Sequence, residues 1–279
     1  MRRSRITITL QKQLIDKIDH LINKEKVRNR SHAIEFILNK HFQGGVKKAV
    51  ILAGGQGTKL RPYTYEIPKS LLPIKGKPLL TYTFESLKKH GIEEIIICTG
   101  YLGEQIKKYF GDGKKLGIRI RYSDDAKPLQ TGGALLKAKH LIGEESFLVI
   151  HGDILTNFQF QDLISFHLEH KPVITVAMTA VENPKEYGQL QLHGTKLVQF
   201  INKGKFPQIS SHLINCGIYA CSPELFNYLT VKKPAFLLEE IIEKLIPKKK
   251  VNGFVFEKQW FDVGCPENYE RAIKEFQEE

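Results

Sequence analysis

The sequence contains few cysteines and no long apolar run. Its four cysteines, among 279 residues, lie far apart or in strand-like contexts without the spacing of metal ligands. We therefore expect neither a metal cluster nor a disulfide framework, and we interpret Cys98, Cys216, Cys221 and Cys265 as buried thiols. No apolar stretch is long enough to span a bilayer, and the basic start leads into alternating residues instead of a signal-peptide core. These absences predict a soluble, cytoplasmic protein without a membrane partner.

Positive charge is distributed unevenly along the chain. The formal net charge is +12. Residues 1–42 contain ten Lys and Arg but only four Asp and Glu, so this short segment carries half of the excess. Such a concentration of basic residues favours nucleic acid as a partner.

The same N-terminal segment has the pattern of a small α/β unit. Arg5 to Leu10 alternates polar and apolar side chains, which predicts a half-buried strand. A helix is expected from about 11 to 24, and Ser31 is expected to cap a second helix. One strand and two short helices bury too little apolar surface alone, so we expect a second copy of the chain to complete the unit.

Residues 3–42 resemble a ribbon-helix-helix domain. The resemblance implies that two chains pair their strands into an antiparallel ribbon that enters the major groove of duplex DNA, while the second helix begins at a phosphate. Arg5, Thr7 and Thr9 would then face the bases, and Ser31 would lie near phosphate. A ribbon that serves only to form a homodimer, or a higher even oligomer, remains the alternative.

A different pattern begins after Gly44 and Gly45, which we interpret as a linker between a domain of residues 1–42 and one of residues 46–279. Strand-like runs alternate with helical patterns, first at 49–53, 94–98, 118–122, 147–150 and 173–178 with helices at 78–90, 103–110, 131–142 and 160–169. Further strands are expected at 189–193, 196–201, 213–220 and 251–257, and further helices near 223–229, 236–246 and 266–277. This succession predicts an α/β fold with a mostly parallel, Rossmann-like sheet and helices on both faces.

A glycine-rich loop follows the first of these strands. Gly54, Gly55 and Gly57 let the chain turn sharply and bring backbone N–H groups close to anionic oxygens. Flanking positions complete the expected nucleotide site and supply cations for several phosphates: Leu52, Ala53, Thr58, Lys59, Arg61 and Lys69. The segment therefore predicts a phosphate site.

The spacing excludes two common glycine-rich loops. A dinucleotide fingerprint would need glycine at Leu60, and a P-loop would need Gly-Lys-Ser/Thr where Lys59-Leu60-Arg61 stands. A tight turn would explain the glycines alone, but not the run that continues through Pro68-Lys69-Ser70-Leu71-Leu72-Pro73. Residues 52–74 resemble the signature of the sugar-1-phosphate nucleotidylyltransferases, and the resemblance extends over residues 48 to about 272.

Two carboxylates follow apolar strand-like segments. Asp153 ends Phe147–His151-Gly152, and Asp262 follows Trp260-Phe261. Asp153 alone is equally well explained as a cap of a helix or turn. Both segments in this order resemble the two metal-binding aspartates of the family, and two carboxylates with phosphate oxygens and waters suit Mg²⁺.

Later segments resemble the family's substrate-binding segments. The resemblance places Gln130, Gly132 and Gly133 beside the nucleotide base, and Lys203 against the sugar phosphate. It assigns the sugar to Tyr187, Gly188, Asn202 and Asn215.

Four positions depart from the family's pattern. Lys59 replaces an arginine, Gln130 a glycine, Asn202 a glutamate and Gly204 a proline. An ammonium is a compact point charge where the family has a planar fork, so these changes bear on substrate identity and rate.

The resemblance implies an Mg²⁺-dependent enzyme that forms a nucleotide sugar and pyrophosphate from an NTP and a sugar 1-phosphate, with Lys59, Arg61, Lys69 and Lys203 acting on the phosphates. The base and the sugar stay open, although the Thr-Gly-Gly-Ala-Leu segment and the short C-terminal part resemble hexose or heptose 1-phosphate guanylyltransferases. The alternative is a DNA-binding regulator whose large domain senses a nucleotide sugar without turnover.

Overall fold

The structure is a computed structural model, which describes residues 6–22, 27–42, 45–201, 210–229 and 233–278. The chain divides into two compact units, Met1–Gly45 and Val46–Glu279. None of the helices in the described residues is long and apolar enough to cross a membrane.

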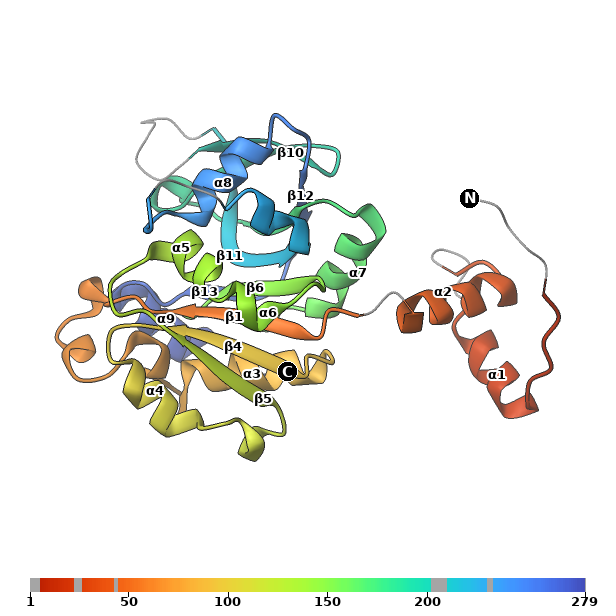
Figure 1. The fold of residues 1–279 in the computed structure, drawn as a ribbon, viewed down its shortest axis with the longest axis horizontal. Helices are drawn as coiled ribbons and strands as arrows, with labels where there is room; N and C mark the ends of the chain where they lie inside the picture. The colour runs from red at the N-terminus through yellow and green to blue at the C-terminus, as the bar shows by residue number, and fades with distance from the viewer. Residues whose placement is uncertain (1–5, 23–26, 43–44, 202–209, 230–232, 279) are drawn as a thin grey trace. The chain divides into compact units, whose positions relative to one another are not determined.

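The first unit contains two helices, α1 (Lys12–His20) and α2 (Arg30–Phe42) (Figure 1). Its buried core consists of Ile18, Val27 and Ala33. The Arg30 guanidinium joins the helices by donating two hydrogen bonds of 2.6 and 2.7 Å to the Asp19 carboxylate. Because both side chains are well exposed, this pair adds little to a very small core.

The start of α2 differs from the prediction. The side chain of Asn29 accepts a 2.9 Å hydrogen bond from the backbone N–H of His32, which is the usual bond of a helix cap. Ser31 lies inside the helix instead. The prediction that Ser31 is the cap was therefore wrong, because Asn29 is placed one residue before the first helical residue.

Residues 6–10 are extended in sequence pattern but are not a strand in the described single chain. Ile6 and Ile8 are 71 and 48 % exposed, whereas Leu10 packs against the small core. The predicted half-buried strand is thus wrong for one chain alone, because a strand needs a hydrogen-bonded neighbour. Thr7 and Thr9 are exposed, and Arg5 lies outside the described residues.

The second unit is built on a nine-stranded sheet in the order β5-β4-β1-β6-β11-β8-β12-β10-β9. Its strands are β1 (Lys48–Ala53), β4 (Glu94–Thr99), β5 (Arg119–Asp124), β6 (Phe147–His151), β8 (Ile174–Ala180), β9 (Gln189–His193), β10 (Lys196–Ile201), β11 (Leu213–Cys221) and β12 (Val251–Val255). Two small two-stranded sheets accompany it, β2 (Pro73–Ile74) with β3 (Lys77–Pro78), and β7 (Ile154–Thr156) with β13 (Trp260–Asp262).

The sheet is mixed, so the expectation of a mostly parallel sheet needs correction. β5, β4, β1 and β6 are parallel, and Val50 of β1 lies between Ile96 and Val149. β11 then runs antiparallel to both β6 and β8. β9 and β10 pair antiparallel across a short turn, because a short connection cannot join parallel neighbours.

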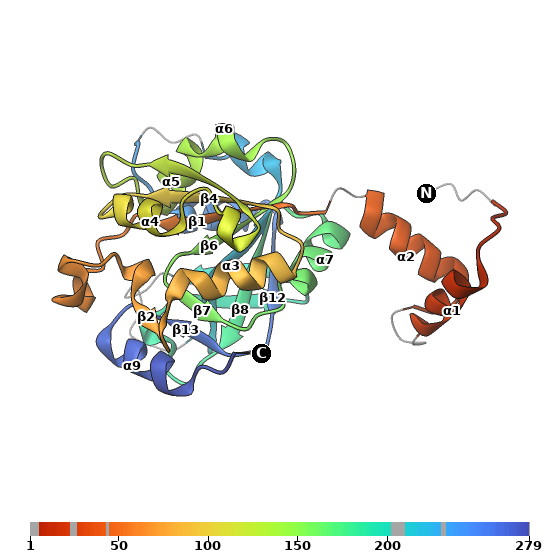
Figure 2. The same ribbon diagram turned by 90° about the horizontal axis from the view of Figure 1, so that it is seen from below.

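Helices cover both faces of this sheet. One apolar cluster joins the strands to α5 (Gln130–Lys137), α6 (Lys139–Ile142) and α8 (Leu238–Leu245). The other joins them to α3 (Leu79–Lys89), α4 (Gly103–Phe110) and α7 (Phe160–His170). Figure 2 shows α3 and α6 on opposite sides of β1. α9 (Pro266–Glu275) closes a third cluster with β7 and β13.

Some local predictions were also wrong. The helix expected over 131–142 is two helices, α5 and α6, and the segment expected to be helical over 223–229 is a 3₁₀ turn, Pro223–Asn227. All four cysteines are free, as predicted. Cys98, Cys216 and Cys221 are buried, but Cys265 is partly exposed because it precedes α9 at the surface.

Candidate active site

Three glycines allow the ends of neighbouring strands to meet at one edge of the sheet. A Cβ at Gly100, after β4, would lie 2.8 Å from the carbonyl oxygen of Gly54, after β1. The N–H of Gly152, after β6, donates a 2.9 Å hydrogen bond to the carbonyl of Leu52. This edge carries the carboxyl ends of β4, β1 and β6, where open α/β sheets bind ligands.

The loop after β1 is held in a defined shape. Gly57 has φ +61°, and a Cβ there would lie 2.8 Å from Cγ2 of Thr64. The Thr64 hydroxyl donates a 2.7 Å hydrogen bond to the Gly57 carbonyl. Short 3₁₀ turns follow, Thr58–Leu60, Tyr63–Tyr65 and Lys69–Leu71. The loop therefore needs glycine at position 57 for both its backbone angle and its space.

The cations predicted for this segment divide into two groups. Lys59 and Arg61 are exposed on either side of buried Leu60, and the Arg61 guanidinium lies 4.9 Å from the centre of the Tyr65 ring. Lys69 is mostly buried and forms an ion pair with Asp153, with 2.5 Å between Nζ and Oδ2. Lys69 is thus fixed inside the site, whereas Lys59 and Arg61 are free to follow a ligand.

Electrostatics keep this pair charged. Burial alone would lower the pKa of Lys69, but Asp153 and then Asp262 raise it above its ordinary value. Burial would likewise raise the pKa of Asp153, but Lys69 and His151 hold it below its ordinary value. The site therefore contains an ammonium and a carboxylate at neutral pH.

The second aspartate reaches the site through two short strands. β13 pairs antiparallel with β7, with Asp262 opposite Ile154, and the N–H of Val263 donates a 2.9 Å hydrogen bond to the carbonyl of Asp153. A Cβ at Gly264 would lie 2.8 Å from Oδ1 of Asp262. The predicted metal-binding aspartates are thus brought together by backbone pairing.

This pair of carboxylates has the chemistry of a magnesium site and not of a complete protein cage. Among the described residues no group of three or more His, Cys, Asp or Glu side chains is arranged to hold a metal ion. Mg²⁺ commonly takes one or two carboxylates and completes its shell with phosphate oxygens and waters. The Lys69 ammonium beside Asp153 shows that a cation is already favoured at this position.

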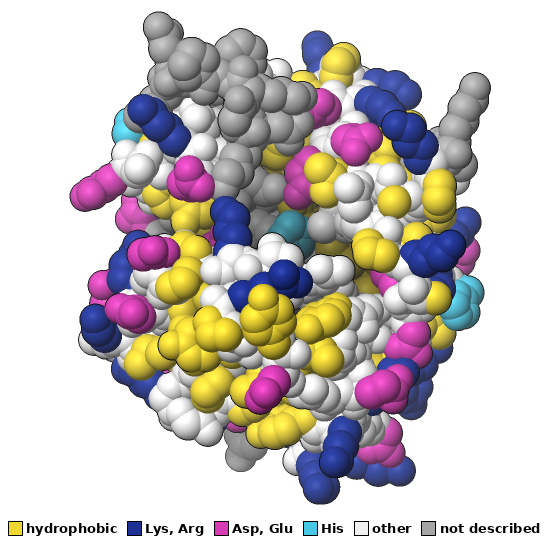
Figure 3. Space-filling model, turned by 90° about the vertical axis from the view of Figure 1, so that its left-hand side faces the viewer, with side chains coloured by type: hydrophobic (Ala, Val, Ile, Leu, Met, Phe, Trp, Pro, Cys, Tyr) yellow, Lys and Arg dark blue, Asp and Glu magenta, His cyan; other side chains and the backbone are white. Residues whose placement is uncertain are grey.

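A cavity of about 260 Å³ opens beside the two aspartates, and Figure 3 shows this hollowed face of the molecule. Its lining includes three residues predicted to bind the sugar, Tyr187, Gly188 and Asn215. Asn215 donates a 2.7 Å hydrogen bond to the hydroxyl of Tyr219, and the Tyr187 ring meets Trp260 edge to face at 5.4 Å. Aromatic walls and fixed polar groups of this kind suit a sugar.

Comparison with known proteins identifies the family. The Nucleotidyl transferase family matches residues 48–279. The chain belongs to the nucleotidyl transferase family. Residues 4–41 match the ribbon-helix-helix protein, copG family, so an N-terminal domain of that type precedes the nucleotidyl transferase.

Relatives of this nucleotidyl transferase act on sugar phosphates. It is 34 % identical over 230 residues to the D-glycero-alpha-D-manno-heptose 1-phosphate guanylyltransferase of Aneurinibacillus thermoaerophilus, covering 82 % of this chain and 98 % of the relative. It is 33 % identical over 228 residues to mannose-1-phosphate guanyltransferase beta-A of Xenopus laevis, covering 80 % of this chain but only 62 % of that relative.

Solved structures agree with the fold. HddC from Yersinia pseudotuberculosis complexed with GMP-PN is similar with a TM-score of 0.69 and 27 % identity, over 83 % of this chain and 100 % of that one. A putative glucose-1-phosphate thymidylyltransferase from Bacillus anthracis has a TM-score of 0.76 over 83 % of this chain and 97 % of its own. At 24 % identity, the second similarity supports the fold alone.

The second glycine-rich segment of the nucleotidyl transferase has a neighbour that the sequence did not predict. The N–H groups of Gly132 and Gly133 donate to the carbonyl of Phe236 at 2.9 and 3.3 Å. A Cβ at Gly132 would lie 2.4 Å from the Phe236 ring, and one at Gly133 would lie 2.3 Å from the Pro234 carbonyl oxygen. These glycines therefore admit the segment before α8, in addition to any role beside a base.

Gln130 lies at the first position of α5 with φ +59°, in the left-handed region. This region favours glycine, which the family has at this position, and costs other residues about 1 kcal/mol. The departure from the family's pattern is thus accommodated in the backbone, with the side chain exposed.

Glu239 is a pocket residue that sequence reasoning missed. It lines the cavity, and its two carboxylate oxygens accept hydrogen bonds from the hydroxyls of Thr131 at 3.2 Å and Tyr219 at 3.3 Å. Its neighbour Glu240 instead binds the N–H of Leu237 at the start of α8. The sequence shows two adjacent glutamates at a helix start, and no local signal separates their roles.

Three residues named by the sequence pattern, Asn202, Lys203 and Gly204, lie outside the described residues. Their roles remain predictions.

Proposed function

We propose that the protein is an Mg²⁺-dependent sugar-1-phosphate guanylyltransferase that forms a nucleotide sugar and pyrophosphate from GTP and a hexose or heptose 1-phosphate. One observation carries this proposal. Lys69, Asp153 and Asp262 converge beside the glycine loop although they come from three distant parts of the chain. The named activities of the relatives support guanine as the base.

The reaction needs little covalent participation by the protein. An oxygen of the sugar 1-phosphate attacks the α-phosphorus of the NTP, a new P–O bond forms, and the bond to the β-phosphate oxygen breaks as pyrophosphate leaves. The attacking phosphate is already anionic at neutral pH, so no general base is required. Catalysis then consists of placing the reactants in line and compensating their charge.

The described cations fit these tasks in different ways. Buried Lys69 would bind and orient a phosphate oxygen at the reacting centre, while exposed Lys59 and Arg61 would receive the departing pyrophosphate. Asp153 and Asp262 would hold the magnesium ion, which supplies further charge compensation when bound. We also propose the phosphate-binding role of Lys203 implied by the family resemblance.

The cavity beside the aspartates would receive the sugar. Tyr187 and Gly188 lie on one wall, and Asn215 on another is oriented by Tyr219. Gly188 is needed because a Cβ there would lie 2.9 Å from the Phe200 ring. Asn202 is proposed here on the resemblance alone.

A substrate matrix tests the proposal. The full-length protein would be assayed with four NTPs against mannose, glucose and heptose 1-phosphates, and pyrophosphate release would be measured with and without Mg²⁺. The proposal expects turnover that depends on Mg²⁺ and is fastest with GTP. Absence of turnover in every combination would contradict it.

We further propose that the N-terminal unit forms a homodimer that binds duplex DNA. Its buried core has only three members, while large apolar side chains of the same unit are exposed: Ile6, Ile8, Leu14, Leu21, Phe36, Ile37 and Leu38. Such a unit needs a partner to bury this surface. The match to the ribbon-helix-helix family supports DNA as the ligand.

That match also supports a second candidate function, a DNA-binding regulator whose large unit binds a nucleotide sugar without producing it. Pyrophosphate release discriminates between the two. Tight binding of a nucleotide sugar with no release under any condition of the matrix would favour the regulator.

A further inference from the structure

A second recess borders the carboxyl ends of β4 and β5. It has a volume of about 580 Å³, and its lining includes Thr99, Gly100, Asp124 and Asp125. Because Gly100 packs directly on Gly54, the recess adjoins the glycine loop. A nucleotide whose phosphates occupy that loop would have this recess within reach of its base.

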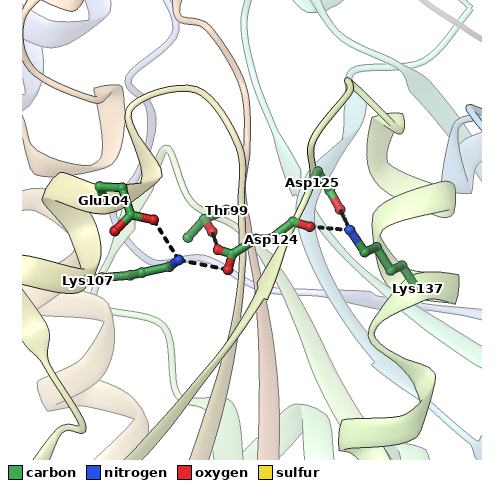
Figure 4. A network of polar contacts seen from close by, with 6 residues as sticks. All are labelled: Thr99, Glu104, Lys107, Asp124, Asp125 and Lys137. Carbon is green, nitrogen blue, oxygen red and sulfur yellow. Dashed lines mark hydrogen bonds and ion pairs between the residues drawn. The ribbon is translucent and has the colours of Figure 1, made fainter.

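Two adjacent carboxylates at the recess differ in their bonding (Figure 4). Asp124 accepts hydrogen bonds from the Thr99 hydroxyl at 2.5 Å and from Lys107 at 2.7 Å. Asp125 is only 6 % exposed, and its Oδ1 atom makes no hydrogen bond. Its ion-pair partner, Lys137, lies 3.5 Å away, which is beyond ordinary hydrogen-bond length. Asp124 is thus saturated, whereas Asp125 is not.

The position of Asp125 is fixed by its surroundings. Its N–H donates a 2.8 Å hydrogen bond to the carbonyl of Thr99, directly after the last paired position of β5. Lys137 is placed by α5, and its ammonium also donates to the carbonyl of Asp124. A carboxylate and an ammonium are therefore presented side by side from a rigid frame.

A carboxylate in this position is costly unless a ligand supplies donors. Burial raises the pKa of Asp125 by more than Lys137 lowers it. Removing a carboxylate from water without a full set of hydrogen bonds disfavours its charged form. A ligand that brings N–H groups to Asp125 would relieve this cost.

We propose that Asp125 and Lys137 recognise the guanine base in this recess, an inference that rests on the proposed guanylyltransferase function. The Watson–Crick edge of guanine presents an acceptor at O6 and then donors at N1 and N2. An ammonium beside a carboxylate presents the complementary order, one donor followed by acceptors. Uracil and thymine offer one donor between two carbonyls, and adenine and cytosine present a ring-nitrogen acceptor where the carboxylate needs a donor.

The test compares GTP with ITP, which keeps O6 and N1–H but lacks the 2-amino group. For the full-length protein we expect kcat/KM to favour GTP over ITP by roughly tenfold or more, as for one base contact. Asp125→Asn should lower kcat/KM for GTP by about 10- to 100-fold and bring the GTP/ITP ratio close to one. Lys137→Met should weaken the use of GTP and ITP alike, because both carry O6.

Asp124→Asn is the matched control. It alters the neighbouring carboxylate and its bonds to Thr99 and Lys107, so it can lower stability, but it should leave the GTP/ITP ratio unchanged. A wild-type ratio in Asp125→Asn, or equal use of GTP and ITP by the wild type, would overturn the proposal. The wild-type comparison decides the case even if Asp125→Asn does not fold.

Calorimetric binding of GDP separates this inference from the proposed function. GDP binding that is lost in Asp125→Asn and retained in Asp124→Asn supports base recognition even if no sugar 1-phosphate is turned over. Turnover with GTP that is insensitive to Asp125→Asn would leave the enzyme activity standing and refute the role of Asp125.

Discussion

The backbone N–H of Val263 donates a 2.9 Å hydrogen bond to the carbonyl of Asp153, which locks the strand that carries Asp262 beside the first aspartate. This bond couples the end of β7 to the end of β13. It holds the backbones of the two acidic positions together independently of their side-chain charges. The carboxylates can therefore be altered while their positions in the fold are kept.

Replacing either carboxylate by an amide should leave the fold intact and remove most activity. Asp153→Asn or Asp262→Asn takes away one negative ligand and preserves shape, so we expect at least about a hundredfold loss of kcat. Pyrophosphate release measures the loss, and circular dichroism checks the fold. Near-normal turnover in either variant would refute the metal assignment.

Gly264→Ala should impair the same site by sterics alone. The added Cβ would lie 2.8 Å from Oδ1 of Asp262, so the carboxylate must move. We expect kcat to fall by roughly tenfold or more, as for other small displacements of a catalytic group, with a raised Mg²⁺ requirement. Gly194→Ala, where no atom lies within 4 Å, is a control that also adds a methyl group. Equal kinetics in both variants would show that Asp262 need not be fixed.

Lys59 offers a subtler test of the loop. If the exposed ammonium faces pyrophosphate, Lys59→Arg should retain or improve activity because a guanidinium binds phosphate through two donors. Lys59→Ala should raise KM for the NTP, measured with saturating sugar 1-phosphate. An alanine variant with wild-type KM and kcat would exclude Lys59 from the site.

A buried histidine predicts how stability depends on pH. His167 is 2 % exposed, bonds to the Thr175 hydroxyl at 2.9 Å, and has its pKa lowered by burial to about 4. Because the unfolded pKa is higher, the unfolded chain binds an extra proton as pH falls between about 6.5 and 4, and stability is lost over that window. From pH 7.5 to 5 the loss attributable to His167 should be about 2 kcal/mol.

Urea unfolding at fixed protein concentration measures this loss. His167→Gln should reduce the difference between the two pH values, whereas His140→Gln, at an exposed histidine, should not. An identical pH dependence in wild type and His167→Gln would contradict the assignment.

Local signals predicted much of the fold and of the phosphate loop. The strand Lys48–Ala53 and the helices on both faces follow from apolar runs and periodicity, and Lys69 lies in a recognisable sequence segment. The direction of β11 did not follow, because strand pairing depends on distant partners and not on its own residues. The pairing of β7 with β13 was hidden for the same reason, since each has only three residues.

Two site residues show the same limit. Asp125 has the sequence context of a strand end, and only packing reveals that its carboxylate lacks a hydrogen bond at Oδ1. Glu239 is distinguished from Glu240 only by what each contacts. Chemistry that depends on burial and on tertiary partners cannot be found from spacing alone.

The N-terminal unit should control assembly and DNA binding but not catalysis. Deleting residues 1–42 removes the exposed Ile6 and Ile8 and leaves the sheet from β1 onward intact. We expect a soluble, active enzyme of lower mass by sedimentation that no longer binds duplex DNA. The full-length protein should bind DNA with an affinity that falls as salt rises, with a log–log slope of about −0.9 per neutralised phosphate. Arg5→Ala should lower sequence preference more than nonspecific affinity, because strand side chains read bases. A full-length dimer with no salt-sensitive DNA binding, even at low ionic strength, would show that the ribbon serves dimerisation alone.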